Sequence, residues 1–192
     1  STAYEPGTGS TIMGYRFTCA PEDLMSADTY FHTASLDQIV NYSTTLSSGG
    51  SCPTLTANGN NMPTVDAGPS YTIPQGTPFI LTATGSDVDG DNLTYCWEEF
   101  DLGNPGPPDT DDGTRPIFRS LTPASSPSRL FPSLANILCP VCVTLGQSMP
   151  VTTRTMNFRV TVRDNRSGGG AASSDETQVN VRADAGPFTV GQ

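Results

Sequence analysis

The sequence contains few positive charges: 9 basic residues stand against 19 acidic ones, giving a formal net charge of −10. Nucleic-acid binding requires clustered cations on one surface, so nucleic acid is excluded as an expected partner. The chain also lacks any apolar run near the ~20 residues needed to cross a bilayer, and no membrane span is predicted. With charged residues at only 15%, disorder driven by charge repulsion is not expected.

Apolar residues are also scarce, at 35% of the chain, whereas 19 glycines and 17 prolines make it rich in turns. Such a chain forms few long helices. Its polar surface must come largely from serine, threonine and asparagine, which is typical of extracellular β-proteins. We therefore expect a secreted, extracellular or cell-surface protein whose export signal lies upstream of Ser1.

Five cysteines agree with an oxidising compartment, where disulfides are stable. Proximity favours Cys19 with Cys52 and Cys139 with Cys142, which leaves Cys96 unpaired, although the sequence does not choose among the possible pairings. A structural zinc site would need a second C-x-x-C pair, so we interpret Cys139-Pro-Val-Cys142 as a local disulfide. The motif has no βαβ surroundings, which disfavours a thioredoxin-like redox role.

One amphipathic helix is predicted in the first third of the chain. Ser35 and Gln38 form an S-x-x-Q capping box at its start. The apolar positions that follow at helical spacing are Leu36, Ile39, Val40 and Leu46. The helix should end near 47–50, and its apolar stripe should dock on another surface because so short a helix is marginal alone. The Gly- and Ser-rich stretch 47–62 is interpreted as a linker.

Beyond residue 62 the hydrophobic period changes to two, which is typical of half-buried antiparallel strands. The alternating apolar positions are Phe79, Leu81 and Ala83; Leu93, Tyr95 and Trp97; Met156, Phe158, Val160 and Val162; and Thr177, Val179 and Val181. Several such strands separated by turns predict a mainly β fold, an antiparallel β-sandwich. The proline-rich stretch 101–150 is expected to form long loops. Its acidic group Asp109, Asp111 and Asp112 is interpreted as a solvated loop rather than a second cation site.

Two strings near the start of the chain resemble a known family. TAYEPGTGSTIMGY, followed by YFHTASLDQI, resembles the end of the catalytic domain of bacterial reprolysin-like metzincins, which are secreted zinc endopeptidases. The resemblance implies that Met13 is the Met-turn methionine beneath the zinc site, where a flexible thioether fills an irregular floor. It also implies that 35–46 is the closing helix of that domain. It allows Tyr15 to approach the zinc and stabilise the transition-state oxyanion.

The H-E-x-x-H motif that binds zinc in that family does not occur in this chain, whose one histidine is His32. A catalytic zinc site needs several protein ligands and a general base, so His32 is expected to be an ordinary residue at the helix start. This chain alone should therefore be inactive, and zinc would belong only to the intact parent. The expected partner is the missing N-terminal protease half, to which residues 1–46 should present an exposed apolar face.

The segment SDVDGDN at 86–92 joins two predicted strands. Alternating carboxylates around a glycine turn place hard oxygens on one concave face, which suits calcium and its about six to eight oxygen ligands. Without a cation, the clustered carboxylates would repel one another. The alternative is a plain D-G hairpin turn with solvated acids.

The segment 60–100 also resembles polycystic-kidney-disease repeats, through its V-D-A-G, S-D-x-D-G-D and Y-x-W pieces. The calcium ligands implied by this resemblance are Asn60, Asp87, Asp89 and Asp164, with Asp91 as a weaker candidate. The resemblance makes 63–192 an immunoglobulin-like sandwich. That sandwich would follow a metzincin remnant at 1–46 and a linker at 47–62.

Two functions follow from these interpretations. The first is the C-terminal fragment of a secreted zinc metalloendopeptidase, with an accessory calcium-stabilised domain for binding or structural support. The second is a non-catalytic extracellular adhesion or surface-assembly module that binds another extracellular protein. In the second, exposed sheet edges could support self-association.

Overall fold

The computed structural model of the chain describes residues 3–15, 28–44, 56–104, 106–139 and 144–187. It is mainly β, as the sequence predicts, with eight strands, two α-helices and a final 3-10 turn. The elements in chain order are α1 (Thr33–Thr44), β1 (Thr64–Asp66), β2 (Tyr71–Pro74), β3 (Phe79–Thr82), β4 (Thr84–Ser86), β5 (Thr94–Glu99), β6 (Ser128–Phe131), α2 (Leu134–Leu138), β7 (Arg154–Arg163), β8 (Ala172–Arg182) and η1 (Ala183–Ala185). No helix among these residues is both long and apolar enough to cross a bilayer.

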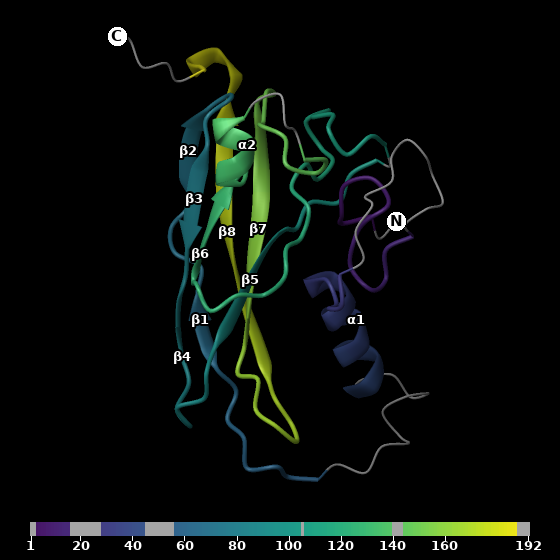
Figure 1. Ribbon diagram of the computed structural model, residues 1–192, viewed down its shortest axis with the longest axis vertical. Coiled ribbons are helices and arrows are strands. Elements are labelled where there is room, and N and C mark those ends of the chain that lie inside the picture. The colour runs from purple at the N-terminus through teal and green to yellow at the C-terminus, as the bar shows by residue number, and fades with distance from the viewer. Residues whose placement is uncertain (1–2, 16–27, 45–55, 105, 140–143, 188–192) are drawn as a thin grey trace.

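The strands form one four-stranded sheet, in the order β2-β8-β7-β5, and two two-stranded sheets, β1-β4 and β3-β6. All pairings are antiparallel except that of β2 with β8. The β7-β8 hairpin is the longest element pair and runs the length of the molecule (Figure 1). This arrangement is compatible with the predicted β-sandwich.

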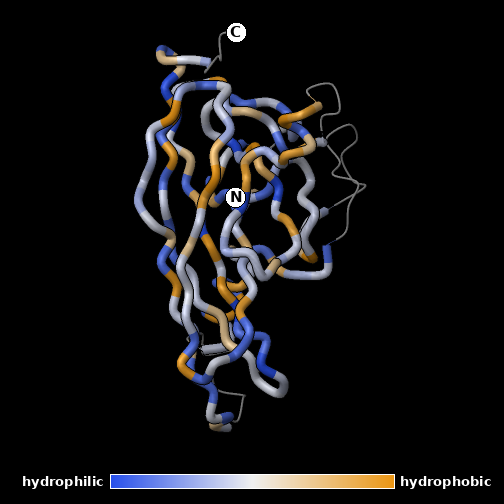
Figure 2. Tube along the Cα trace, turned by 60° about the vertical axis from the view of Figure 1, so that its left-hand side comes forward, coloured by the Kyte–Doolittle hydropathy of each residue, from blue (hydrophilic) through white to orange (hydrophobic). Residues whose placement is uncertain are grey.

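The core lies between the four-stranded sheet and the β3-β6 pair. Its centre is a group of aromatic rings, in which Phe131 lies 4.8 Å from Phe158 and 5.2 Å from Phe79 between ring centroids. The predicted inward positions of β7 and β8 are buried: Met156, Phe158, Val160, Val162, Thr177, Val179 and Val181. Figure 2 shows hydrophobic segments along the strands and hydrophilic turns at the end opposite the C-terminus. Burying each large apolar side chain stabilises the fold by roughly 1.5–3 kcal/mol.

Strand β5 departs from the predicted alternation, because both of its faces are buried. Trp97 belongs to the core, as expected, but its neighbours Cys96 and Glu98 are also inaccessible to solvent. The second face is covered by the N-terminal segment, in which Tyr30 donates a hydrogen bond to Ser120, and Ser120 donates one to Glu98 at 2.6 Å. A strand covered on both sides cannot show a clean period of two.

The N-terminal segment is folded and docked on the sandwich. Its first turn is held by Glu5, whose carboxylate accepts hydrogen bonds from the backbone of Ser10 and Thr11. The ring of Tyr4 stacks on Phe100 with centroids 4.8 Å apart. Further along, Asp28 pairs with Arg119 at 3.0 Å, Tyr30 with Ser120, and Asp37 with Arg159. Residues 3–15 and 28–44 therefore pack against the sandwich at several points.

Helix α1 begins two residues before the predicted capping box. Ser35 lies inside the first turn, so the S-x-x-Q prediction was wrong. His32 occupies the cap position, where its Nδ1 accepts the backbone N–H of Ala34 at 3.2 Å. Only Thr33 and Ala34 of the helix are buried. The predicted apolar stripe is docked poorly, because Ile39 and Val40 are exposed.

Two other predictions concern the linker and the cysteines. The part of the predicted linker that is described, 56–62, packs against neighbouring loops through hydrogen bonds from Asn58 to Gly169 and from Asn61 to Asp89. Of the two cysteines among the described residues, Cys96 is unpaired, as proximity predicted, and Cys139 is disulfide-bonded. The predicted partners Cys19, Cys52 and Cys142 lie outside the described residues.

Candidate metal centre

Three loops meet at the end of the sandwich opposite the C-terminus (Figure 1). They are the 56–63 segment before β1, the 87–93 loop between β4 and β5, and the 164–171 loop between β7 and β8. The antiparallel pairing of β5, β7 and β8 brings the second and third loops to one end of the sheet. Polar side chains from all three loops point toward one another there.

Asp87, Asp91 and Asp164 form the centre of this cluster. Each offers a carboxylate oxygen, and the three oxygens lie within 4.8 Å of one another. Asp164 is only 1% exposed. The Oδ2 atoms of Asp87 and Asp91 are buried and accept no hydrogen bond. Buried carboxylate oxygens without a donor are costly, so this arrangement favours a bound cation.

The turn that carries Asp87 provides hydrogen-bond donors for one of its two carboxylate oxygens. Its Oδ1 accepts the backbone N–H of Asp89 at 2.8 Å and that of Asp91 at 3.2 Å. Gly90 has a φ of +78°, a left-handed conformation that glycine adopts without strain. A plain D-G turn would need no more than these contacts. It leaves unexplained why the other oxygen of Asp87 points into the cluster.

Asp164 is held rigidly by neighbouring donors. Its carboxylate accepts the backbone N–H groups of Arg166 and Ala171 and the side-chain amide of Asn60, the last at 2.6 Å. The Asn60 hydrogen bond is the main reason that the pKa of Asp164 lies below its ordinary value. A side chain at Gly170 would bring its Cβ within 2.8 Å of Asp164 Oδ1, so this close loop requires glycine. Asp164 is thus ionised and positioned before any ligand arrives.

Asp89 lies beside the cluster rather than in it. Its carboxylate accepts the backbone and side-chain N–H groups of Asn61, at 2.7 and 2.8 Å, and these contacts lower its pKa. The structure therefore brings Asn60, Asp87 and Asp164 together as the sequence predicts, but it places the weaker candidate, Asp91, at the centre in place of Asp89. A repeated D-x-D pattern cannot show which carboxylate a turn directs inward.

Sequence reasoning missed the positive charge in the cluster. Nη1 of Arg166 lies 3.1 Å from Asn60 Oδ1, 3.1 Å from Asp89 Oδ2 and 3.8 Å from Asp91 Oδ2. The Arg166 guanidinium is thus a positive charge next to the carboxylates of the cluster. It donates no hydrogen bond to Asp91 Oδ2. The signal was in the sequence, because Arg166 follows the proposed ligand Asp164 by two positions.

These residues fit a hard dication. Three acidic side chains and one asparagine can supply oxygen atoms as anionic and neutral ligands, and carboxylate and amide oxygens are the ligands of calcium. The residues that would hold it are Asn60, Asp87, Asp91 and Asp164. Calcium would neutralise the carboxylates and hold the three loops together.

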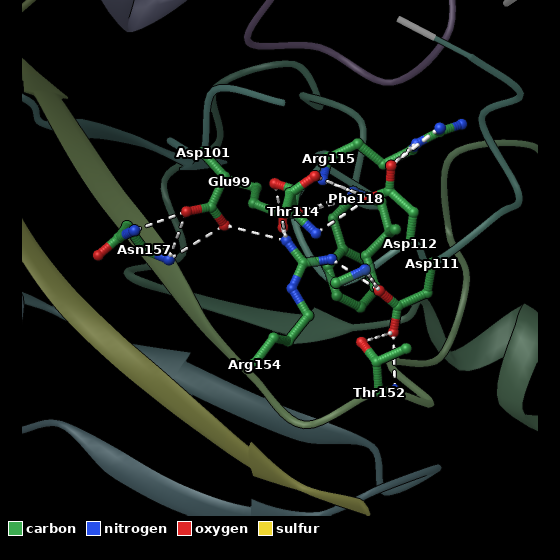
Figure 3. A network of polar contacts seen from close by, with 12 residues as sticks. Glu99, Asp101, Asp111, Asp112, Thr114, Arg115, Phe118, Thr152, Arg154 and Asn157 are labelled. Carbon is green, nitrogen blue, oxygen red and sulfur yellow. Dashed lines mark hydrogen bonds and ion pairs between the residues drawn. The ribbon is translucent and has the colours of Figure 1, made fainter. Parts of the chain in front are cut away.

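The second acidic group, Asp109, Asp111 and Asp112, differs from the candidate metal centre because hydrogen bonds and ion pairs within the protein satisfy it (Figure 3). The Asp111 side chain is only 1% exposed, so the prediction that it is solvated was wrong: its carboxylate accepts backbone N–H groups of Val151 and Thr152 and pairs with Arg154 at 3.0 Å. Burial acts to raise the pKa of Asp111, but these backbone donors outweigh it and lower the pKa. Asp109 and Asp112 are exposed.

Arg154 joins that group to two further acids. Its buried guanidinium lies 3.2 Å from Glu99 and 3.4 Å from Asp101, on the side away from Asp111. Burial, followed by the nearby Asp101 charge, raises the pKa of Glu99 well above its ordinary value. Every acid here has a donor within the protein, so this network holds the 101–120 loop against β7 and offers no cation site.

The residues assigned to zinc chemistry lie elsewhere. Met13 and Tyr15 are on the N-terminal segment and are 61% and 76% exposed. His32 is buried, with Nδ1 hydrogen-bonded to the backbone N–H of Ala34 and Nε2 3.8 Å from Glu98 Oε1, so it is not available to a metal.

The free cysteine Cys96 does not form a reactive site either. Burial raises the pKa of Cys96 to about 12, which makes this thiol a poor nucleophile at neutral pH.

Comparisons of the chain with protein-family models, with curated proteins and with solved structures found no match. The functional conclusion therefore depends on the residues themselves.

Proposed function

We propose that this chain is a non-catalytic C-terminal part of a secreted bacterial zinc metalloendopeptidase, in which an immunoglobulin-like sandwich supports the last segment of a metzincin domain. One observation carries the proposal: the turn that bears Met13 is folded and docked, yet Ile12 and Met13 are exposed. An ordered turn with large apolar side chains facing solvent is typical of a surface that another part of a protein covers.

The exposed apolar residues of α1 agree with this proposal. Ile39, Val40 and Tyr42 are all exposed, whereas the first turn of the helix is buried against the sandwich. The segment thus has one side docked on the sandwich and another that would pack against the catalytic half. In that assembly Met13 would lie beneath zinc held by histidines of the other half, and Tyr15 would be near enough to stabilise an oxyanion.

The role of the sandwich in this proposal is mechanical. It fixes the segment through Glu98, Ser120 and Arg119, and calcium in the cluster of Asp87, Asp91 and Asp164 would tie the loops at its far end. The cluster is separate from the surface around Met13. Calcium would therefore act on stability and resistance to proteolysis, and not in the peptide-bond hydrolysis itself.

The proposal is tested by peptide mapping and intact-mass analysis of the protein from its native source. The expected result is a longer precursor, or a second co-purifying chain, that carries an H-E-x-x-H motif and binds zinc. A native protein whose first residue is encoded as Ser1, with no such companion, would rule out the protease assignment.

The alternative is a non-catalytic extracellular adhesion or surface-assembly module. It is favoured by β2, which lies at the edge of the four-stranded sheet and exposes Tyr71. An exposed edge can pair with another strand. Sedimentation velocity over a wide concentration range would show reversible self-association if this is the function. A monomer at every concentration, with no binding to glycans or cell surfaces, would count against it.

A further inference from the structure

Arg166 contacts the candidate metal centre with both its backbone and its side chain. Its backbone N–H donates to Asp164 Oδ1 at 3.2 Å. Its Nη1 reaches across the loops to Asn60 Oδ1 and Asp89 Oδ2, both at 3.1 Å, and lies 3.8 Å from Asp91 Oδ2. The guanidinium therefore lies among the same oxygens that would ligate calcium.

A guanidinium and a dication cannot share these oxygens. Two of the groups that Arg166 faces, Asn60 and Asp91, belong to the ligand set, and like charges a few ångströms apart repel. We propose that Arg166 is a built-in competitor for calcium, which balances the acidic cluster in the calcium-free protein and is displaced when the ion binds. This inference rests on the proposed calcium function of the cluster.

Displacement of this side chain requires little rearrangement. The Arg166 side chain is 34% exposed, so part of it already lies in water. Its backbone can remain on Asp164 while the long side chain rotates outward. The ion pairs that are lost are partly exposed, so water compensates for part, but not all, of their contribution.

The competitor would have two effects on the protein. Without calcium, its charge offsets the repulsion among Asp87, Asp89, Asp91 and Asp164 and keeps the three loops assembled. With calcium, the cost of displacing it lowers the affinity. A site weakened in this way would suit the high calcium concentrations outside cells, where modules bind with dissociation constants of about 10⁻⁴–10⁻³ M.

The test compares Arg166→Gln with Arg182→Gln by calorimetric titration with calcium chloride. Arg182 pairs with Asp184 at the opposite end of β8, so its variant makes the same charge change away from the cluster. Arg166→Gln should bind calcium about tenfold more tightly than the native chain, because removing one positive charge near a dication is worth about a factor of ten. It should also melt at a lower temperature in EDTA. Arg182→Gln should match the native chain in both.

Other results have distinct meanings. If the native chain binds calcium and Arg166→Gln binds equally or more weakly, Arg166 is no competitor and the inference is wrong. If no variant binds calcium, the proposed calcium function itself fails. Should Arg166→Gln not fold, the native chain still gives an answer: the side-chain Nε–H signal of Arg166, assigned with Arg166→Lys, should shift and narrow during a calcium titration. A signal that does not change would overturn the inference.

Discussion

The carboxylate of Glu98 lies 2.9 Å from the backbone nitrogen of Thr33, so a side chain of β5 caps helix α1 across 65 positions of sequence. The same carboxylate accepts a hydrogen bond from Ser120 and lies 3.8 Å from His32. One buried acid thus joins the N-terminal segment to the sandwich. These contacts of Glu98 hold the N-terminal segment in place and so fix the position of its exposed side.

Glu98→Ala should destabilise the protein by about 3 kcal/mol, because it leaves the buried N–H of Thr33 and hydroxyl of Ser120 without an acceptor. In the variant, the amide protons of the first turn of α1 should exchange faster than in the native chain. The amide protons of β7 and β8 should remain more protected than those of α1. Glu176→Ala, at an exposed acid of β8, is the control and should change the free energy of unfolding by less than about 0.5 kcal/mol. Equal effects of both variants would contradict the capping role.

Arg154→Met should destabilise the protein by about 3–5 kcal/mol, since it leaves Glu99, Asp101 and Asp111 with uncompensated charge in the interior. Urea unfolding followed by tryptophan fluorescence measures the loss, because Trp97 lies in the adjoining core. Arg182→Met removes an exposed ion pair and should be nearly neutral. A small effect of Arg154→Met would mean that the 101–120 loop does not depend on this network.

The free energy of unfolding should fall as the pH is lowered from about 5 to 2. The pKa of Asp111 is lower in the folded chain than its unfolded value of about 3.9, so its contribution is present above that value and is lost as the pH falls through the folded-state pKa. Asp111→Asn should make the dependence on pH shallower in this range. Urea titrations at several pH values measure both slopes. Identical slopes would contradict the assignment.

The exposure of Met13 predicts its chemistry. Dilute hydrogen peroxide should oxidise Met13 and Met62 much faster than Met156, which is fully buried. Peptide mapping by mass spectrometry measures each rate. In a preparation of the longer parent protein, Met13 should become protected while Met62 stays reactive. Rapid oxidation of Met13 in the parent would contradict its burial beneath a catalytic half.

The sequence predicts the long regular strands better than it predicts contacts between residues that are far apart in the chain. β7 and β8 are long and have one core face, so their period of two is clear and their inward residues are buried as predicted. The start of α1 is missed because one of its two capping side chains, Glu98, lies far away in the sequence. The enclosure of the Asp111 side chain is missed for the same reason, since its partner Arg154 is 43 positions away.

The acidic cluster was predictable in composition but not in geometry. The D-x-D-G-D pattern identifies the loop, and the resemblance to polycystic-kidney-disease repeats implies Asn60 and Asp164. Which carboxylate points inward depends on the turn at Gly90 and on Asn61, which occupies Asp89. Neither contact is visible in a local pattern.

The most direct test of the account is the melting temperature of the native chain and of Asp87→Asn, each in EDTA and in excess calcium. Calcium at about 100 times its dissociation constant adds about 2.7 kcal/mol, which should raise the melting temperature by about 5–10 °C. Asp87→Asn keeps the turn-capping oxygen and loses the charge, so it should be as stable as the native chain in EDTA and gain little from calcium. Asp66→Asn is the matched control, because Asp66 caps Gly68 in the same way outside the cluster, and it should retain the full gain. An unchanged melting temperature of the native chain in calcium and EDTA would contradict the account.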